Sequence, residues 1–324
     1  MPNIRFPRRG SMQYWPRKRA KRIVPRVRSW PKVEDIKLLG FLGYKVGMTS
    51  VIVKDDTPNS MNKGKSIVLP VTVIECPPIK ILSVRLYKRD YFGLRVIKEV
   101  FVDQNKYIKR RLPGIKKQDL KEVEGLLNQA DDLRVVIYTQ PHLTGIGKKT
   151  PDLLEIAIGG NNIKDKFEFV KSLIGKSIYA HDVFQPMMYV DIRAITKGKG
   201  YQGPVKRFGV TLRSHKSEKT RRGPGSLGPW NAQGHIMYRV AHAGQMGYHQ
   251  RIEYNKLIIA IGNKPNEVNI KGGFVHYGIV RNPYILIKGS VPGTPKRPVV
   301  LTYPHRKRKQ ERYILQSIDL SSNQ

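Results

Sequence analysis

Cysteine is nearly absent from this chain of 324 residues, and Cys76 is the only one. A single thiol excludes a disulfide framework and leaves too few ligands for a zinc knuckle. Cys76 ends the apolar run Val71-Thr72-Val73-Ile74-Glu75-Cys76 and precedes two prolines, which favours a packed small hydrophobe over a nucleophile. The lack of disulfides is typical of the reducing cytoplasm, where we expect the protein to work.

Long hydrophobic runs are also missing. No apolar stretch approaches the ~18 residues that a membrane-spanning helix needs, so we predict no membrane association. The N-terminus begins Met-Pro-Asn-Ile-Arg and lacks the apolar stretch of a secretory signal. An Arg-rich start without acids also resembles an organelle transit peptide, but prolines at 7, 16, 25 and 31 break any amphipathic helix there.

Negative charge is scarce: 24 Asp and Glu stand against 60 Lys and Arg, and the formal net charge is +36. The excess is concentrated. Residues 1–32 hold eleven Lys/Arg and no acid, residues 196–256 hold twelve against two acids, and residues 296–312 hold seven against one. Crowded like charges destabilise a compact protein by self-repulsion. The pattern therefore indicates a polyanionic partner, and a phosphate backbone is the obvious one, since each contact releases a condensed counterion.

Patterning divides the chain into four parts. We predict a basic N-terminal extension at 1–33, a β core at 34–79 and 180–301, an α+β insertion at 80–179, and a basic and polar C-terminal tail at 302–324. Short β-prone runs at 38–53, 67–74, 189–195, 257–261, 274–280 and 284–287, separated by glycines as in hairpins, predict the core strands. Such alternation suggests a small closed barrel. In the insertion, runs at 84–87, 133–138 and 154–158 predict strands, and 119–130 and 162–174 predict helices.

Two basic segments have no sustained periodicity. Residues 196–256 form a predicted long basic loop with ten glycines, and a structureless stretch this long is improbable in a compact domain unless it is functional. Trp230 stands among its glycines, either as a tip residue touching RNA or as a packing anchor. The extension carries aromatic residues such as Tyr14, Trp15 and Trp30, which argue against a disordered tail and for packing into RNA or stacking on bases.

Other candidate sites are weak. The turn Gly145–Thr150 lacks the first glycine of a phosphate loop and has no Ser/Thr directly after Lys148, so a basic turn fits better. The run 197–200 resembles a dinucleotide loop only loosely, and phosphate contact by a flexible backbone is favoured. His235, His242 and His249 recur every seven residues, but nearby glycines disfavour a helix and no carboxylate or cysteine completes a metal site. RNA contact or simple packing remains open for them.

We therefore predict no catalytic residue, metal, cofactor or small-molecule substrate, because no paired carboxylates or activated nucleophile are visible either. The predicted RNA-binding residues come from the basic stretches and are Arg8, Arg9, Arg17, Lys18, Arg19, Lys21, Arg22, Lys197, Lys199, Lys206, Arg207, Arg213, Lys216, Arg221, Arg222, Trp230, His235, Arg239, His242, Gln245, His249, Arg251, Arg306, Lys307, Arg308 and Lys309.

Three blocks carry a family resemblance: residues 43–49 (GYKVGMT), residues 228–249, and residues 272–278 (GGFVHYG) with 289–293 (GSVPG). On these blocks the chain resembles the universal large-subunit ribosomal protein three family over nearly its whole length. The long N-terminus and basic tail are similar to the archaeal and eukaryotic branch, and the short C-terminus to its archaeal members.

The resemblance implies a mainly β fold with an α+β insertion, a six-stranded barrel of the translation-protein type, a long basic finger and an N-terminal extension. It implies a structural protein of the large ribosomal subunit that binds 23S rRNA and neighbouring ribosomal proteins, nucleates early assembly and supports the peptidyl transferase centre. Trp230 corresponds to the family's tip tryptophan. Eukaryotic members carry a modified histidine where Arg221 stands here, so that modification is not expected. The alternatives are an rRNA-modifying enzyme, a translation factor or a DNA compactor.

Overall fold

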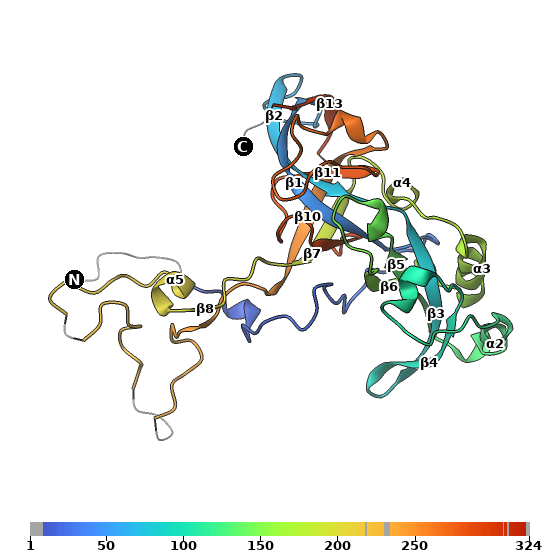
Figure 1. Cartoon of the computed structure of the whole chain (residues 1–324), viewed down its shortest axis with the longest axis horizontal. Helices are drawn as coiled ribbons and strands as arrows, with labels where there is room; N and C mark the ends of the chain where they lie inside the picture. The colour runs from blue at the N-terminus through green and yellow to red at the C-terminus, as the bar shows by residue number, and fades with distance from the viewer. Residues whose placement is uncertain (1–8, 218, 230–233, 307, 310, 322–324) are drawn as a thin grey trace. The chain divides into compact units, whose positions relative to one another are not determined.

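The computed structural model describes residues 9–217, 219–229, 234–306, 308–309 and 311–321. The described chain is mainly β, with several antiparallel sheets and short helices (Figure 1). It divides into two compact units. Unit 1 comprises Met1–Arg22 and Ile195–Gln250, and unit 2 comprises Ile23–Ala194 and Arg251–Gln324.

The largest sheet has seven strands in the order β12-β7-β10-β11-β2-β1-β13. Because β12 pairs with β1 as well as β7, the hydrogen-bonded pairings link six strands in a ring, and β13 pairs with the second half of β1. Their bounds are β1 Gly40–Asp55, β2 Ser66–Glu75, β7 Tyr189–Ile195, β10 Gln250–Gly262, β11 Tyr284–Lys288, β12 Pro298–Thr302 and β13 Tyr313–Ile318.

The glycines of β1 do not separate hairpins, which corrects the expectation for 38–53. β1 is one continuous strand of 16 residues. A Cβ at Gly43 would lie 2.6 Å from Cγ2 of Ile74, and one at Gly47 would lie 2.8 Å from Cδ1 of Phe274. These glycines therefore leave room for close neighbours within an extended strand, rather than turning the chain.

The insertion forms a second antiparallel sheet in the order β4-β3-β5-β6 (Figure 1). Its strands are β3 Ile79–Asp90, β4 Gly93–Phe101, β5 Asp132–Thr139 and β6 Leu153–Ala157, and the short helices of this region are α1 Lys106–Lys109, α2 Lys121–Glu124, α3 Ile163–Leu173 and α4 Ala180–Val183. One apolar cluster contains Phe41 of β1, Val190 of β7 and Leu133 of β5, all fully buried. The two sheets therefore share a hydrophobic core.

Sequence patterning succeeded for one helix and for the strands β2, β3, β5, β6, β7, β10 and β11, and it failed for several other elements. The helix predicted at 162–174 is confirmed as α3, whose Asn162 caps the N-terminus and whose Phe167 and Val170 are buried. The helix predicted at 119–130 is wrong beyond one turn: α2 ends at Glu124 with Gly125 as its C-cap, and a 3₁₀ turn follows at Leu127–Gln129. Glycine is a poor helix former, and packing of the apolar face does not require one continuous helix here.

The strand expected at 274–280 is instead a tight turn. Phe274 and Gly278 exchange two backbone hydrogen bonds of 2.9 Å, and both Phe274 and Tyr277 are buried. Strands β4, β12 and β13 were not predicted, and β13 lies in the segment 302–324 expected to be only a basic and polar tail. The burial pattern of β4 is irregular and β12 is fully buried, so neither has a clear period of two in the sequence, while β13 alternates over only four residues.

A buried carboxylate organises the end of β2. Glu75 is fully buried and accepts hydrogen bonds from the Tyr277 hydroxyl, from the backbone N–H groups of Arg281 (3.0 Å) and Asn282 (2.9 Å), and from the Asn282 amide (2.7 Å). Burial, followed by the charge of Glu75, raises the pKa of Tyr277 far above its ordinary value, so the phenol stays a donor. One acceptor thus joins β2 to the turn before β11.

Replacing Glu75 by Ala leaves the buried Tyr277 hydroxyl and the partly buried donors of residues 281 and 282 without their acceptor. We expect Glu75→Ala to lower the free energy of unfolding by about 3 kcal/mol, at the upper end for an unsatisfied buried group. Denaturant titration followed by circular dichroism measures it. Glu168→Ala, at an exposed position on α3, is the matched control and should change stability by less than about 0.5 kcal/mol. Equal stability of the two variants would contradict the role of Glu75.

Candidate nucleic-acid interface

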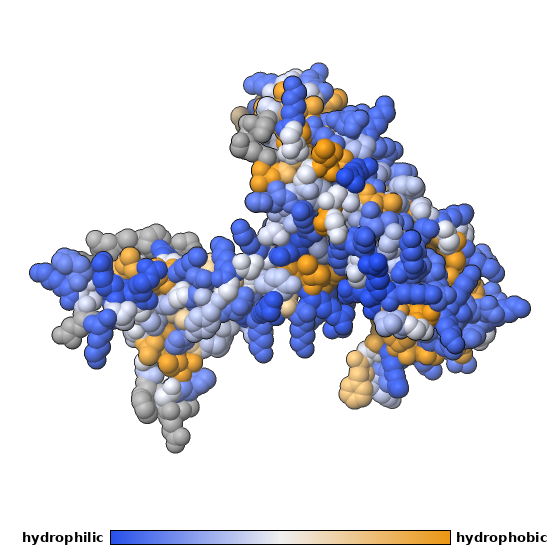
Figure 2. Space-filling view, in the orientation of Figure 1, coloured by the Kyte–Doolittle hydropathy of each residue, from blue (hydrophilic) through white to orange (hydrophobic). Residues whose placement is uncertain are grey.

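Unit 1 is far more basic than the rest of the chain. Its 78 residues contain 18 Lys/Arg and a single acid, Glu218, which lies outside the described residues. Figure 2 shows hydrophilic side chains over much of this unit. In unit 2 the insertion neutralises several of its cations internally: Arg85 and Arg134 both bond to Glu155, at 2.8 Å and 2.9 Å. Unit 1 has no comparable supply of carboxylates of its own.

The N-terminal arm and the base of the finger are hydrogen-bonded to each other within unit 1. The Ala20 N–H donates to the Tyr248 carbonyl at 2.8 Å, and the Arg19 guanidinium lies 5.0 Å from the centre of the Tyr248 ring. The buried imidazole of His249 places Nδ1 2.9 Å from the Lys18 carbonyl. A carbonyl only accepts, so Nδ1 carries the proton.

The two sides of the finger base are also paired. Thr196 and His249 exchange two hydrogen bonds, Lys199 donates its N–H to Met246, and β8 (Tyr201–Gln202) pairs with β9 (Gly244–Gln245). Gly247 adopts a φ of +71°, and a Cβ there would lie 2.0 Å from the Lys197 carbonyl oxygen. Glycine is therefore required at this close approach of two backbones.

Arg207 joins the first half of the finger to the segment 242–245 of its second half. It lies on α5 (Pro204–Phe208) and donates Nε to the Gln245 carbonyl at 3.1 Å and Nη1 to the His242 carbonyl at 2.9 Å. Partial burial lowers the pKa of Arg207 from its ordinary value. Its planar fork bonds two carbonyls at once, which a lysine cannot do in the same geometry.

Aromatic side chains of the arm pack on protein. The Trp15 ring lies 5.4 Å from that of Tyr238 in an edge-on arrangement, and Arg17 lies between the rings of Trp15 and Phe208, at 5.5 Å and 4.5 Å. Phe208 is buried. Trp30, in unit 2, packs against the large apolar cluster. These contacts make Trp15 and Trp30 anchors of the extension, and their packing or stacking on RNA stays a prediction.

The basic tail, which is part of unit 2, is attached to the rest of that unit by its own contacts. The Tyr189 hydroxyl donates to the Lys309 carbonyl at 3.0 Å, and Glu311 bonds to Lys288 at 2.5 Å and to Arg308 at 3.5 Å. These cations, first among them Lys288, lower the pKa of Glu311 despite its partial burial. The tail thus presents Arg306, Arg308 and Lys309 from a fixed base, with all three exposed.

The weaker candidate sites have internal explanations. Lys148, the lysine of the turn at 145–150, donates to the fully buried carboxylate of Asp152 at 2.5 Å, which supports a structural turn. Cys76 is buried, and burial raises the pKa of its thiol. Among the described residues, no group of three or more His, Cys, Asp or Glu could hold a metal ion. Nor does the described part of the chain contain a helix long and apolar enough to cross a membrane.

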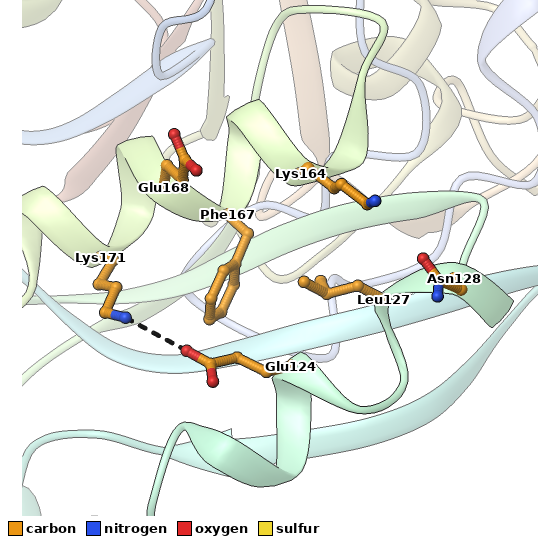
Figure 3. A pocket seen from close by; sticks show the side chains of 7 residues that line it. All are labelled: Glu124, Leu127, Asn128, Lys164, Phe167, Glu168 and Lys171. Carbon is orange, nitrogen blue, oxygen red and sulfur yellow. Dashed lines mark hydrogen bonds and ion pairs between the residues drawn. The ribbon is translucent and has the colours of Figure 1, made fainter.

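One surface hollow of about 380 Å³ lies between α2 and α3 in unit 2. It is lined by Glu124, Leu127, Asn128, Lys164, Phe167, Glu168 and Lys171 (Figure 3). Lys171 bonds to Glu124 across it at 3.2 Å. A specific small-molecule site usually has an apolar lining with a few convergent polar groups, and this hollow has a mixed, self-paired charged rim instead.

Comparison with known proteins decides the family. The family model described as ribosomal protein L3 matches residues 1–324. The chain belongs to this family. It is similar to the large ribosomal subunit protein uL3 of Archaeoglobus fulgidus (48% identity, covering 90% of this chain and 89% of the relative), of Methanocaldococcus jannaschii (45%, 92% and 91%) and of Pyrobaculum aerophilum (49%, 94% and 93%). The predicted resemblance to archaeal members is confirmed.

In this L3-family chain most of the predicted RNA-binding cations are exposed. The exposed residues are Arg9, Lys18, Arg19, Lys21, Arg22, Lys197, Lys199, Lys206, Arg213, Lys216, Arg221, Arg222, His235, Arg239, Arg306, Arg308 and Lys309. Arg17, Arg207, His242, Gln245 and Arg251 are partly buried, and His249 is buried. Arg8, Trp230 and Lys307 lie outside the described residues. Sequence reasoning missed the supporting aromatics Phe208, Tyr238 and Tyr248, whose only signal was their place in basic stretches.

The two adjacent cations of α5 should behave differently. Arg207→Gln removes two hydrogen bonds to the finger backbone, so amides in peptides 200–209 and 242–248 should exchange about tenfold faster, the effect of losing roughly 1.4 kcal/mol of local stability. Hydrogen-exchange mass spectrometry measures it. Lys206→Gln removes the same charge from an exposed neighbour and should leave exchange unchanged. Equal effects would assign the change to charge alone.

Proposed function

We propose that the chain is a structural constituent of the large ribosomal subunit and binds its 23S-type rRNA mainly through unit 1. The observation that supports this is the excess of 18 Lys/Arg over one acid in a unit that presents most of them to solvent. Phosphates neutralise such cations and release counterions, which drives binding without any base-specific contact. The relatives are named as proteins of the large ribosomal subunit, which agrees with this partner.

Preorganisation is the second part of the proposal. Ala20 and His249 tie the arm to the finger, and Arg207 joins the two sides of the finger, so the chain orders part of its cationic backbone before RNA arrives. Ordering beforehand lowers the entropic cost of binding. Recognition then depends on the spacing of charges along this scaffold, and A-form RNA is itself recognised mostly by shape and backbone.

We infer that the six-stranded ring of unit 2 is the translation-protein-type barrel implied by the family resemblance. The ring and the insertion share an apolar core, so we expect them to form the rigid part of unit 2. Neighbouring large-subunit proteins are further proposed partners. A protein whose extensions need RNA to neutralise them is suited to join the subunit early, which supports a role in nucleating assembly.

The proposed role near the catalytic centre rests on the finger. Trp230 corresponds to the family's tip tryptophan, and the cations at 221–222 lie on the segment that leads to it. We propose that the finger reaches towards the peptidyl transferase centre and that Trp230 fixes its tip by stacking. Small displacements beside a reaction centre affect rate more than their energy suggests, because reactant positioning is a large part of catalysis.

Salt dependence tests the RNA interface. The full chain is titrated with large-subunit rRNA fragments at several salt concentrations. The triple variant Lys18→Gln, Lys21→Gln, Arg22→Gln should reduce the magnitude of the negative slope of log K against log salt by about 2 to 3, roughly one for each lost phosphate contact. The control triple Lys121→Gln, Lys164→Gln, Lys176→Gln removes the same charge from exposed positions of the insertion. Identical slopes for the two triples would contradict a specific role of the arm.

The tip is tested separately. Trp230→Ala should cost about 1 to 3 kcal/mol of stacking, which is small beside the summed phosphate contacts, so subunits should contain normal amounts of the protein. Peptidyl transfer, or sensitivity to antibiotics of that centre, should nevertheless change. Leu227→Ala on the same segment is the control, since Leu227 has no ring to stack. Trp230→Ala subunits equal to wild type in both assays would contradict the tip assignment.

A further inference from the structure

A second cationic surface lies in unit 2, outside the three stretches described above. Residues 106–117, which follow β4, contain Lys106, Lys109, Arg110, Arg111, Lys116 and Lys117 and no acid. All six are exposed, and none forms an ion pair with a described residue. Elsewhere in the insertion, Arg85, Lys98 and Arg134 bond to carboxylates. The local excess is hidden at sequence level, because the insertion as a whole is rich in acids.

This surface is built on an anchored loop. The Gln118 N–H donates to the Phe101 carbonyl at 2.8 Å and ties the two ends together, and the Gln104 amide donates to the Ile115 carbonyl at 2.7 Å across it. Ile108 is buried in an apolar cluster with Tyr138 of β5, and Leu112 and Ile115 pack against the same cluster. Compact loops with joined ends and their own packed side chains frequently carry function.

The carboxylate and the imidazole near the loop both face inward contacts. Asp103, at its start, accepts a hydrogen bond of 2.5 Å from the Tyr138 hydroxyl, and so faces the sheet. The Tyr107 and His142 rings stack at 4.1 Å. Burial, and after it the charge of Lys106, lowers the pKa of His142. The imidazole is therefore neutral at neutral pH and adds no positive charge to this surface. The apolar side chains and Asp103 thus fix the loop to the sheet, and the cations lie on its exposed side.

We propose that residues 106–117 form a second, independent RNA-binding surface that contacts the phosphate backbone. A protein partner fits less well, because interface cores are enriched in aromatic residues and depleted of lysine. No described residue between 97 and 142 is an exposed large hydrophobic. Six exposed cations on a fixed loop match a row of phosphates, and a rigid loop loses little entropy when it binds.

The test uses the full chain and the same rRNA fragments. The triple variant Lys109→Gln, Arg110→Gln, Arg111→Gln should lower the salt slope by about 2 to 3 relative to the control triple at Lys121, Lys164 and Lys176. The charge-preserving pair Arg110→Lys, Arg111→Lys should keep the wild-type slope. A slope equal to that of the control triple would overturn the proposal, whatever the arm variant shows. A loop effect without an arm effect would instead support this surface and reject the interface proposed on unit 1.

A second measurement distinguishes the partner. A photo-crosslinking residue placed at Lys116 of the chain in assembled large subunits should attach to rRNA. Attachment only to an acidic segment of a neighbouring protein, or to nothing, would overturn the phosphate assignment. Because Lys116 is exposed and lies outside the anchoring contacts, the substitution should leave the loop folded.

Discussion

Electrostatic self-repulsion is the constraint around which this molecule is built. Unit 1 carries 18 Lys/Arg with one acid, and no apolar cluster of the kind that stabilises unit 2 includes its described residues. Its order comes from backbone hydrogen bonds, from guanidinium groups on aromatic faces and from the fork of Arg207. These contacts need little buried apolar surface, and they leave most of the charged groups exposed to solvent. The unit is therefore partly ordered by its own contacts but electrostatically incomplete without a polyanion.

Unit 2 supplies the opposite balance. Its ring of strands and its insertion share one apolar core, and buried polar side chains also bond across the junction between them. The Tyr44 hydroxyl of β1 donates to Asp152 and lies 2.8 Å from the Thr139 hydroxyl, while Lys148 reaches the same carboxylate. Burial, and then the charge of Asp152, raises the pKa of Tyr44 well above its ordinary value, so the network keeps its proton. The shared Oδ2 atom of Asp152 thus joins β1 to the insertion within unit 2.

Charge pairing separates scaffold from surface in both units. Where a cation supports the fold, it faces a carboxylate or a carbonyl, as Arg134 and Arg207 do. Where the cations at 106–117 have no such partner, they stand on an anchored loop with their apolar neighbours turned inward. Two of the predicted RNA-binding residues also support the fold: Arg207 bonds to the finger backbone and His249 to the arm, and their contact with RNA stays a prediction.

Composition and motifs by themselves determined the uneven charge, the family, the lack of a disulfide framework, and helix α3, because these depend on residue type and local spacing. Only the tertiary structure decided which distant segments meet. Pairing of β13 with β1 and of arm with finger brings together residues far apart in the chain, and no local period records such contacts. The glycines at 43 and 47 were predicted to mark turns. In the structure they leave room for Ile74 and Phe274, which are distant in sequence. The orientation of the cations at 106–117 likewise follows from Ile108 entering the sheet's apolar cluster, which sequence alone leaves open.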